Sequence, residues 1–104
     1  MFNLSAIHDV NTGIILTTLV IAYMKSRKMK DIGIYGLLAL VIFLFSILPT
    51  PIHGKGIWGI MTLLTTYIFL YRAWDNKEIT AFLLTAIVLM MVNIVLGLKL
   101  RGIF

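Results

Sequence analysis

The chain has 104 residues, of which 61% are hydrophobic, and it carries a formal net charge of +5 with no cysteine. A chain of this length forms one domain, and the absence of cysteine excludes disulfides, thiolate chemistry and cysteine metal sites. Two histidines and four carboxylates are too few for a usual structural zinc site. The composition therefore favours a membrane protein.

Four apolar stretches follow one another and leave almost no residues for a soluble domain. They are Ala6 to Met24, Ile32 to Leu48, Ile57 to Tyr71 and Ile79 to Leu98. A bilayer core about 30 Å thick is crossed by about 20 helical residues, and lipid offers no partner to an unpaired backbone group. The third stretch is short, so we extend it back through Gly54. The sequence predicts an all-α integral membrane protein, a single domain over residues 1–104 with transmembrane helices at about 6–24, 32–48, 54–71 and 79–98.

The ends of these predicted helices carry ordinary helix signals. Asp31 is placed to cap the second helix, and Pro49 and Pro51 end it because proline cannot continue a helix. Asp75 or Asn76 precedes the fourth helix and is its predicted cap.

Basic residues are distributed unequally between the two sides of the predicted bundle. The short connections make successive helices antiparallel neighbours, which gives an up-and-down bundle. One side receives Lys25, Arg27, Lys28, Lys30, Arg72 and Lys77. The other side receives Lys55, Lys99 and Arg101. Because basic loops stay in the cytoplasm, we predict a multi-pass protein of the cell membrane with its N-terminus and C-terminus outside.

The two halves of the chain resemble each other. The shared order is an isoleucine and histidine, a glycine and a threonine pair: Ile7, His8, Gly13, Thr17 and Thr18, then Ile52, His53, Gly59, Thr65 and Thr66. The match needs a gap of one or two residues and rests on few positions, so chance similarity between apolar helices is the alternative. A true repeat would form two parallel two-helix units related by an axis along the membrane normal.

His8 and His53 are the candidate cofactor ligands, because they are the two histidines of the chain and lie near the outer ends of the first and third predicted helices. Two neutral imidazoles from two helices at one depth can hold a b-type haem in a small membrane bundle, with Lys55, Lys99 or Arg101 beside the propionates. The alternative is that each histidine is an interfacial polar residue bound to water or a headgroup.

The polar residues that stand out inside the predicted spans are hydroxyls and one amide. Two rows each share a helix face: Thr62, Thr65 and Thr66 in the third helix, and Ala86, Met90, Asn93 and Gly97 in the fourth. Small and polar residues at this spacing let membrane helices approach closely and hydrogen-bond, so we predict that both rows are helix interfaces. The alternative is a passive pore or small carrier lined by Thr62, Thr65, Thr66 and Asn93.

No motif for catalysis stands out, and Asp, Glu, Lys and Arg are absent from the middle of every predicted span. A proton-coupled transporter needs an ionisable group there. We therefore expect a protein that is not an enzyme and acts through assembly, as an accessory or structural subunit of a membrane complex or as a homo-oligomer. The alternatives are a haem bundle for electron transfer, with His8 and His53 as axial ligands, and the pore or carrier. Membrane lipid, not nucleic acid, is the predicted partner of the basic loops.

Overall fold

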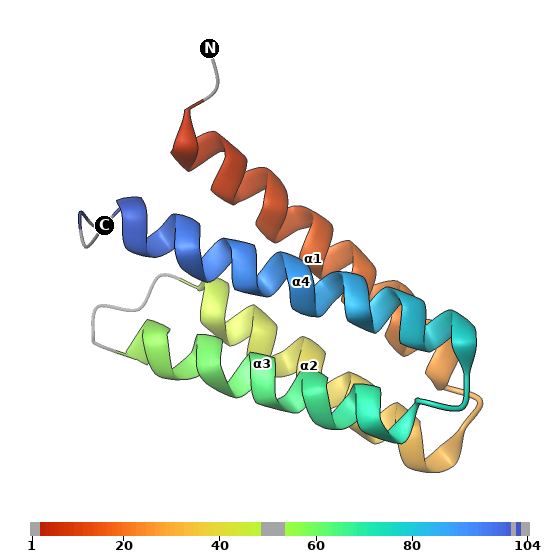
Figure 1. Cartoon of the computed structure of the whole chain (residues 1–104). Coiled ribbons are helices and arrows are strands. Elements are labelled where there is room, and N and C mark those ends of the chain that lie inside the picture. The colour runs from red at the N-terminus through yellow and green to blue at the C-terminus, as the bar shows by residue number, and fades with distance from the viewer. Residues whose placement is uncertain (1–2, 49–53, 101, 103–104) are drawn as a thin grey trace.

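The computed structural model describes residues 3–48, 54–100 and 102, and this part of the chain contains four α-helices. They are α1 (Leu4–Ser26), α2 (Lys30–Ile47), α3 (Gly54–Arg72) and α4 (Lys77–Leu100). The helices run up and down in turn, and the turns from α1 to α2 and from α3 to α4 lie at the same end (Figure 1). This arrangement confirms the predicted all-α up-and-down bundle. The helix bounds differ from the predicted ranges by at most two residues.

Side-chain amides cap two of the helices. The Oδ1 atom of Asn3 accepts a hydrogen bond from the backbone N–H of Ser5 (3.2 Å) at the start of α1. Asn76 does the same for α4, where its Oδ1 atom accepts from the N–H groups of Glu78 (3.2 Å) and Ile79 (3.3 Å). Each amide satisfies donors that have no partner inside the helix.

The prediction that Asp31 caps α2 is wrong. The helix begins one residue earlier, at Lys30, after an N-cap residue, Met29, that makes no side-chain cap hydrogen bond. Asp31 therefore lies in the first turn, where its carboxylate stabilises the helix through the dipole. At the other end, Leu48 is extended with a ψ of 143°. This is the conformation that a residue before proline prefers.

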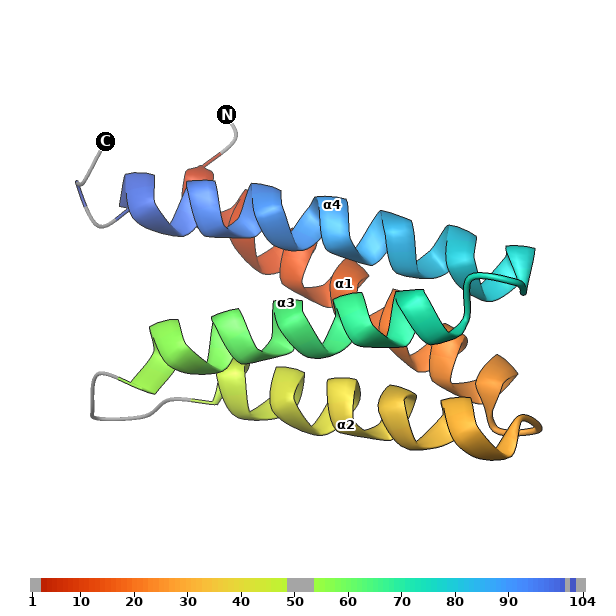
Figure 2. The same ribbon diagram turned by 60° about the horizontal axis from the view of Figure 1, so that its bottom comes forward.

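The four helices form a ring of neighbours with two closely packed pairs. The most extensive contacts are those of α1 with α4 and of α2 with α3, and both hairpins add further contacts. The two views show the first pair lying over the second (Figure 1, Figure 2). The principal extents of 42 × 30 × 18 Å describe a flattened bundle.

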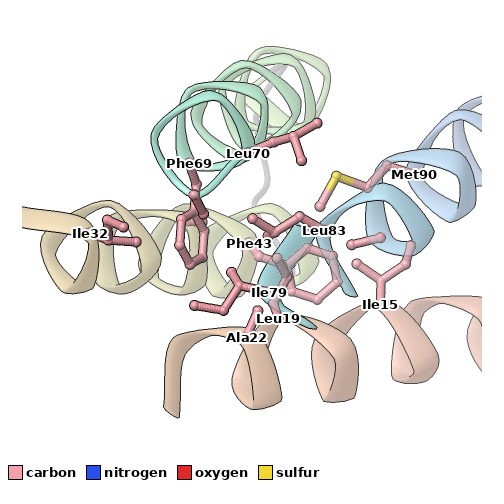
Figure 3. Packing of buried hydrophobic residues seen from close by; sticks show 13 residues of the cluster. Ile15, Leu19, Ala22, Ile32, Phe43, Phe69, Leu70, Ile79, Leu83 and Met90 are labelled. Atoms are coloured by element: carbon pink, nitrogen blue, oxygen red, sulfur yellow. The ribbon is translucent and has the colours of Figure 1, made fainter. Parts of the chain in front are cut away.

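The core lies where the two pairs meet, and every helix contributes to it. Figure 3 shows Ile15 and Leu19 of α1, Phe43 of α2, Phe69 of α3 and Leu83 of α4 directed toward one another. The side chains of Ile15, Phe69 and Leu83 are fully buried. The packed interior thus joins all four helices in one apolar cluster.

Gly36 marks a close approach between helices. A Cβ atom added there would lie 3.1 Å from the Cε2 and Cζ atoms of Phe69 on α3 and 3.1 Å from Cδ1 of Tyr23 on α1. Carbon atoms in ordinary contact are about 3.5 to 4.0 Å apart. The missing side chain therefore makes room for the Phe69 ring.

Eight of the ten buried positions in the described part of the first half recur at a spacing of 47 residues in the second half, which has nine. The eight are 15, 19, 22, 26, 32, 36, 39 and 43 in the first half, and 62, 66, 69, 73, 79, 83, 86 and 90 in the second. This register needs no gap, unlike the match noted from the sequence. It aligns His8 with Lys55 instead of His53.

The outward faces of the helices are also apolar. Large exposed side chains include Ile14 on α1, Leu37 on α2, Leu64 on α3 and Val88 on α4. By length and composition, α1 and α4 are each able to cross a membrane, and the apolar part of α2, Asp31–Ile47, is shorter.

Candidate functional site

A cluster of polar side chains joins α1 to α4 inside the bundle. The Nδ2 group of Asn11 donates to the carbonyl oxygen of Leu89 (2.9 Å) and to Oδ1 of Asn93 (3.1 Å). The Nδ2 group of Asn93 donates to the hydroxyl oxygen of Thr12 (3.1 Å), and this hydroxyl donates to the carbonyl oxygen of His8 (2.9 Å). The chain of hydrogen bonds thus crosses between the first and the last helix three times.

The polar cluster lies well inside the bundle, so its hydrogen bonds affect the stability of the fold. Asn11 and Asn93 each lie seven residues from the nearer end of their helix, which is about 10 Å along the axis. Asn11 is 7% exposed. A buried amide without partners costs about 1–3 kcal/mol, so the mutual bonds of Asn11 and Asn93 favour one alignment of α1 against α4. Neutral amides and a hydroxyl can hold such an alignment or bind a polar group, but they carry no charge.

His8 lies at the outer edge of the cluster, half-buried against α4. Its Nδ1 atom is 3.9 Å from Oδ1 of the exposed Asp9. Its Nε2 atom lies 3.9 Å from the place where a Cβ atom of Gly97 would stand, so the glycine leaves room for the imidazole ring. His53 is outside the described residues, and the haem hypothesis stays a prediction. Within residues 3–48, 54–100 and 102, no three His, Asp or Glu side chains gather as a metal site.

The residues predicted to form a row on α4 are placed along its inner face. Ala86 and Met90 are buried in the apolar core, at 0% and 6% exposure. Asn93 and Gly97 continue the row toward the C-terminal end and are half-buried against Asn11 and His8 of α1. The structure thus brings Asn93 and Gly97 together with residues of the first helix.

The threonines of α3 have a different surrounding. Thr62 and Thr66 are buried at 2% and 0% exposure, and Thr65 is half-buried. The hydroxyl of Thr62 donates to the carbonyl oxygen of Trp58 (2.7 Å), and that of Thr66 donates to the carbonyl oxygen of Thr62 (2.8 Å). These two hydroxyls donate hydrogen bonds within α3. The two threonines therefore contribute packing to the bundle, whereas the hydrogen bonds between α1 and α4 come from the amides.

Asn11 and Thr12 are the site residues that the sequence reasoning missed. Asn93 is the one amide predicted at a helix interface, although Asn11 is a second amide within the first apolar stretch. The signal was present, because a carboxamide in a membrane span needs a polar partner and the first and last helices of a closed ring are neighbours. Thr12 gave no comparable signal, since a hydroxyl can bond to its own helix.

Comparison with known proteins adds no family to these observations. No protein-family model matches the chain, and neither the curated proteins nor the solved structures contain a significant match.

Proposed function

We propose that this protein is an integral membrane protein with four spanning helices that acts through assembly in the membrane. The observation that carries the proposal is the apolar outer surface of the bundle, which bears large exposed side chains on all four helices. A soluble monomer rarely exposes an apolar patch of more than a few hundred Å². Lipid tails are a matching environment for such a surface.

The charged residues support the same proposal by their position. Segments 10–24, 32–47, 57–71 and 79–98 contain no Asp, Glu, Lys or Arg. At the end with the two turns lie the exposed residues Lys25, Arg27, Lys28, Arg72 and Lys77. Asp9 and Lys99 lie toward the opposite end of the bundle. Charges at both ends and an apolar band between them are the distribution that a bilayer requires.

Orientation in the membrane is tested with single cysteines at two exposed positions. One is Ser5 on α1, and the other is Lys28 in the turn between α1 and α2. The natural chain contains no cysteine, so each variant has one reactive thiol. We expect a membrane-impermeant maleimide to label Ser5→Cys from outside intact cells and Lys28→Cys after the membrane is opened, because basic loops stay inside. Labelling of Ser5→Cys from the cytoplasmic side alone would contradict the orientation. Release of the protein by alkaline carbonate would contradict membrane integration.

The accessible surface supports assembly. It measures 7139 Å², whereas a soluble monomer of this length exposes roughly 5,900 Å². A flattened bundle of four helices has little interior of its own and much apolar surface that a second copy or another membrane subunit can cover. We expect native mass spectrometry of tagged protein in a mild detergent to detect a homo-oligomer or a co-purifying membrane subunit. A lone monomer across several mild detergents would contradict this proposal.

We propose further that the two hairpins are a tandem duplication, related by an axis along the membrane normal. The support is the spacing of 47 residues that relates eight pairs of buried positions. In this register, nine of the 32 pairs from Leu16 to Ile47 are identical, among them Lys30 with Lys77 and Ile32 with Ile79. The order of contacts agrees, because the α2–α3 pair corresponds to the α4–α1 pair and both are extensive.

A further inference from the structure

Two charged clusters at the end with the two turns correspond to each other in the register of 47 residues. In the first, Nζ of Lys25 lies 6.0 Å from the ring centroid of Phe82. In the second, Cζ of Arg72 lies 5.5 Å from the ring centroid of Tyr35. Lys25 corresponds to Arg72 and Phe82 to Tyr35. Each hairpin therefore places a cation near an aromatic ring of the other hairpin, at corresponding positions.

The two clusters differ in their carboxylate. In the first, Oε2 of Glu78 lies 3.0 Å from Nζ of Lys25 and neutralises it. The corresponding residue of the second cluster is Asp31, which is one methylene shorter than a glutamate. Among the described residues, no ion pair with an N–O distance within 4.0 Å joins Asp31 to Arg72. The two charges instead line a surface cavity of about 400 Å³ together with Ile34 and Tyr35.

We infer that this cavity binds the headgroup of a phospholipid with an ethanolamine amine, in which Arg72 holds the phosphate and Asp31 the ammonium group. This inference rests on the proposed membrane location. A guanidinium presents a planar set of donors that matches a phosphate, and a carboxylate accepts hydrogen bonds from an ammonium group. A pair of opposite charges held apart in one cavity fits a zwitterion better than a simple anion.

The surroundings of the two charges fit the same ligand. Asp31 lies in the first turn of α2 and Arg72 is the last residue of α3, so both stand at the edge of the apolar band, where headgroups lie. Ile34 is exposed and offers an apolar contact for the adjoining part of the lipid. A choline headgroup has no N–H to donate to Asp31, and a glycerol headgroup has no cation.

The inference is tested by adding lipids back to purified, delipidated protein in detergent and counting bound lipids by native mass spectrometry. We expect phosphatidylethanolamine to bind about tenfold more tightly than phosphatidylcholine with the same acyl chains, because one charge-assisted hydrogen bond distinguishes them. Phosphatidylglycerol is expected to bind more weakly as well. Inorganic phosphate, used as a competitor, is expected to leave lipid binding unchanged.

Variants of the two clusters test whether lipid binding depends on the cavity between Asp31 and Arg72 and not on the ion pair between Lys25 and Glu78. Asp31→Glu is expected to reach Arg72 as Glu78 reaches Lys25, which closes the cavity and abolishes the preference for ethanolamine. Arg72→Gln removes the ligand of the phosphate, which both lipids share, so it is expected to weaken the binding of ethanolamine and choline lipids alike. The matched control, Lys25→Gln, should keep the preference. Circular dichroism of each variant checks that the helices are intact.

Three results would overturn the inference: equal binding of ethanolamine and choline lipids by the natural protein, an unchanged preference in folded Asp31→Glu, or displacement of the lipid by inorganic phosphate at similar concentrations. Each of them leaves the membrane location standing if carbonate does not release the protein. Release by carbonate contradicts the proposed function itself, so the two failures are distinguishable.

Discussion

Replacing Gly36 with leucine is expected to lower the free energy of unfolding by about 1 to 3 kcal/mol, the usual cost of overpacking a filled core. The first carbon of the new side chain would already lie 3.1 Å from the ring of Phe69 and 3.1 Å from Tyr23. The Phe69 side chain is fully buried in the apolar cluster, so a shift of its ring displaces other core residues. The midpoint of thermal unfolding in detergent, followed by circular dichroism, measures the loss.

The proposed duplication suggests a second substitution that should compensate for Gly36→Leu. The positions that correspond to Gly36 and Phe69 hold Leu83 and Ala22, so the large and the small residue are exchanged between the two halves. Phe69→Ala alone leaves a cavity, at a cost of about 3 to 5 kcal/mol for a fully buried ring. We expect Gly36→Leu combined with Phe69→Ala to be clearly more stable than the sum of the two single losses. If the loss in the double variant equals the sum of the two single losses, the idea that the large and the small residue are exchanged between the two halves is contradicted.

The second large effect is expected at the amides that join α1 to α4. Asn11→Leu and Asn93→Leu each break the hydrogen bond between the two side chains, and each leaves the remaining amide partly unpaired. We expect a loss of about 1 to 2 kcal/mol for either change and a smaller further loss when both are combined. A double-mutant cycle on thermal or denaturant unfolding gives the coupling energy between the two residues, expected at about 0.6 to 1.7 kcal/mol.

A threonine of the same helix provides the control for this cycle. Thr17 is exposed, and its hydroxyl donates within α1 to the carbonyl oxygen of Gly13 (2.9 Å). Thr17→Val should therefore change stability by no more than about 0.5 kcal/mol. A coupling energy of zero between Asn11 and Asn93, with normal single-variant folding, would show that their hydrogen bond does not stabilise the bundle.

The helices and their order could be predicted from the sequence because the signals are long and unambiguous. Charged or proline-containing segments separate the four apolar stretches, and short connections allow few arrangements besides up and down. The inward faces could not be predicted in the same way. In α2, the buried Ile32 and Phe43 and the exposed Leu37 and Val41 are all apolar, so periodicity carries little information about which side faces the core.

The candidate site could be predicted in part for the same reason. Asn93 stands out in the fourth stretch as an amide among apolar residues, and the structure places it against α1. Its partner Asn11 becomes evident once the ring order brings the first and last helices together. The predicted N-cap of α2, Asp31, is two residues away from the observed one, Met29. Helix starts vary by a residue or two when no strong cap is present.

The polar bonds between α1 and α4 also bear on how the protein is made. The partners of Asn11 lie 78 and 82 residues further along the chain, a distance that a ribosome covers in about 4 to 16 s. In the proposed membrane location, the carboxamide of Asn11 is without these two partners during that interval. We therefore expect α1 to keep another polar contact, with water, a lipid headgroup or an insertion factor, until α4 has been made.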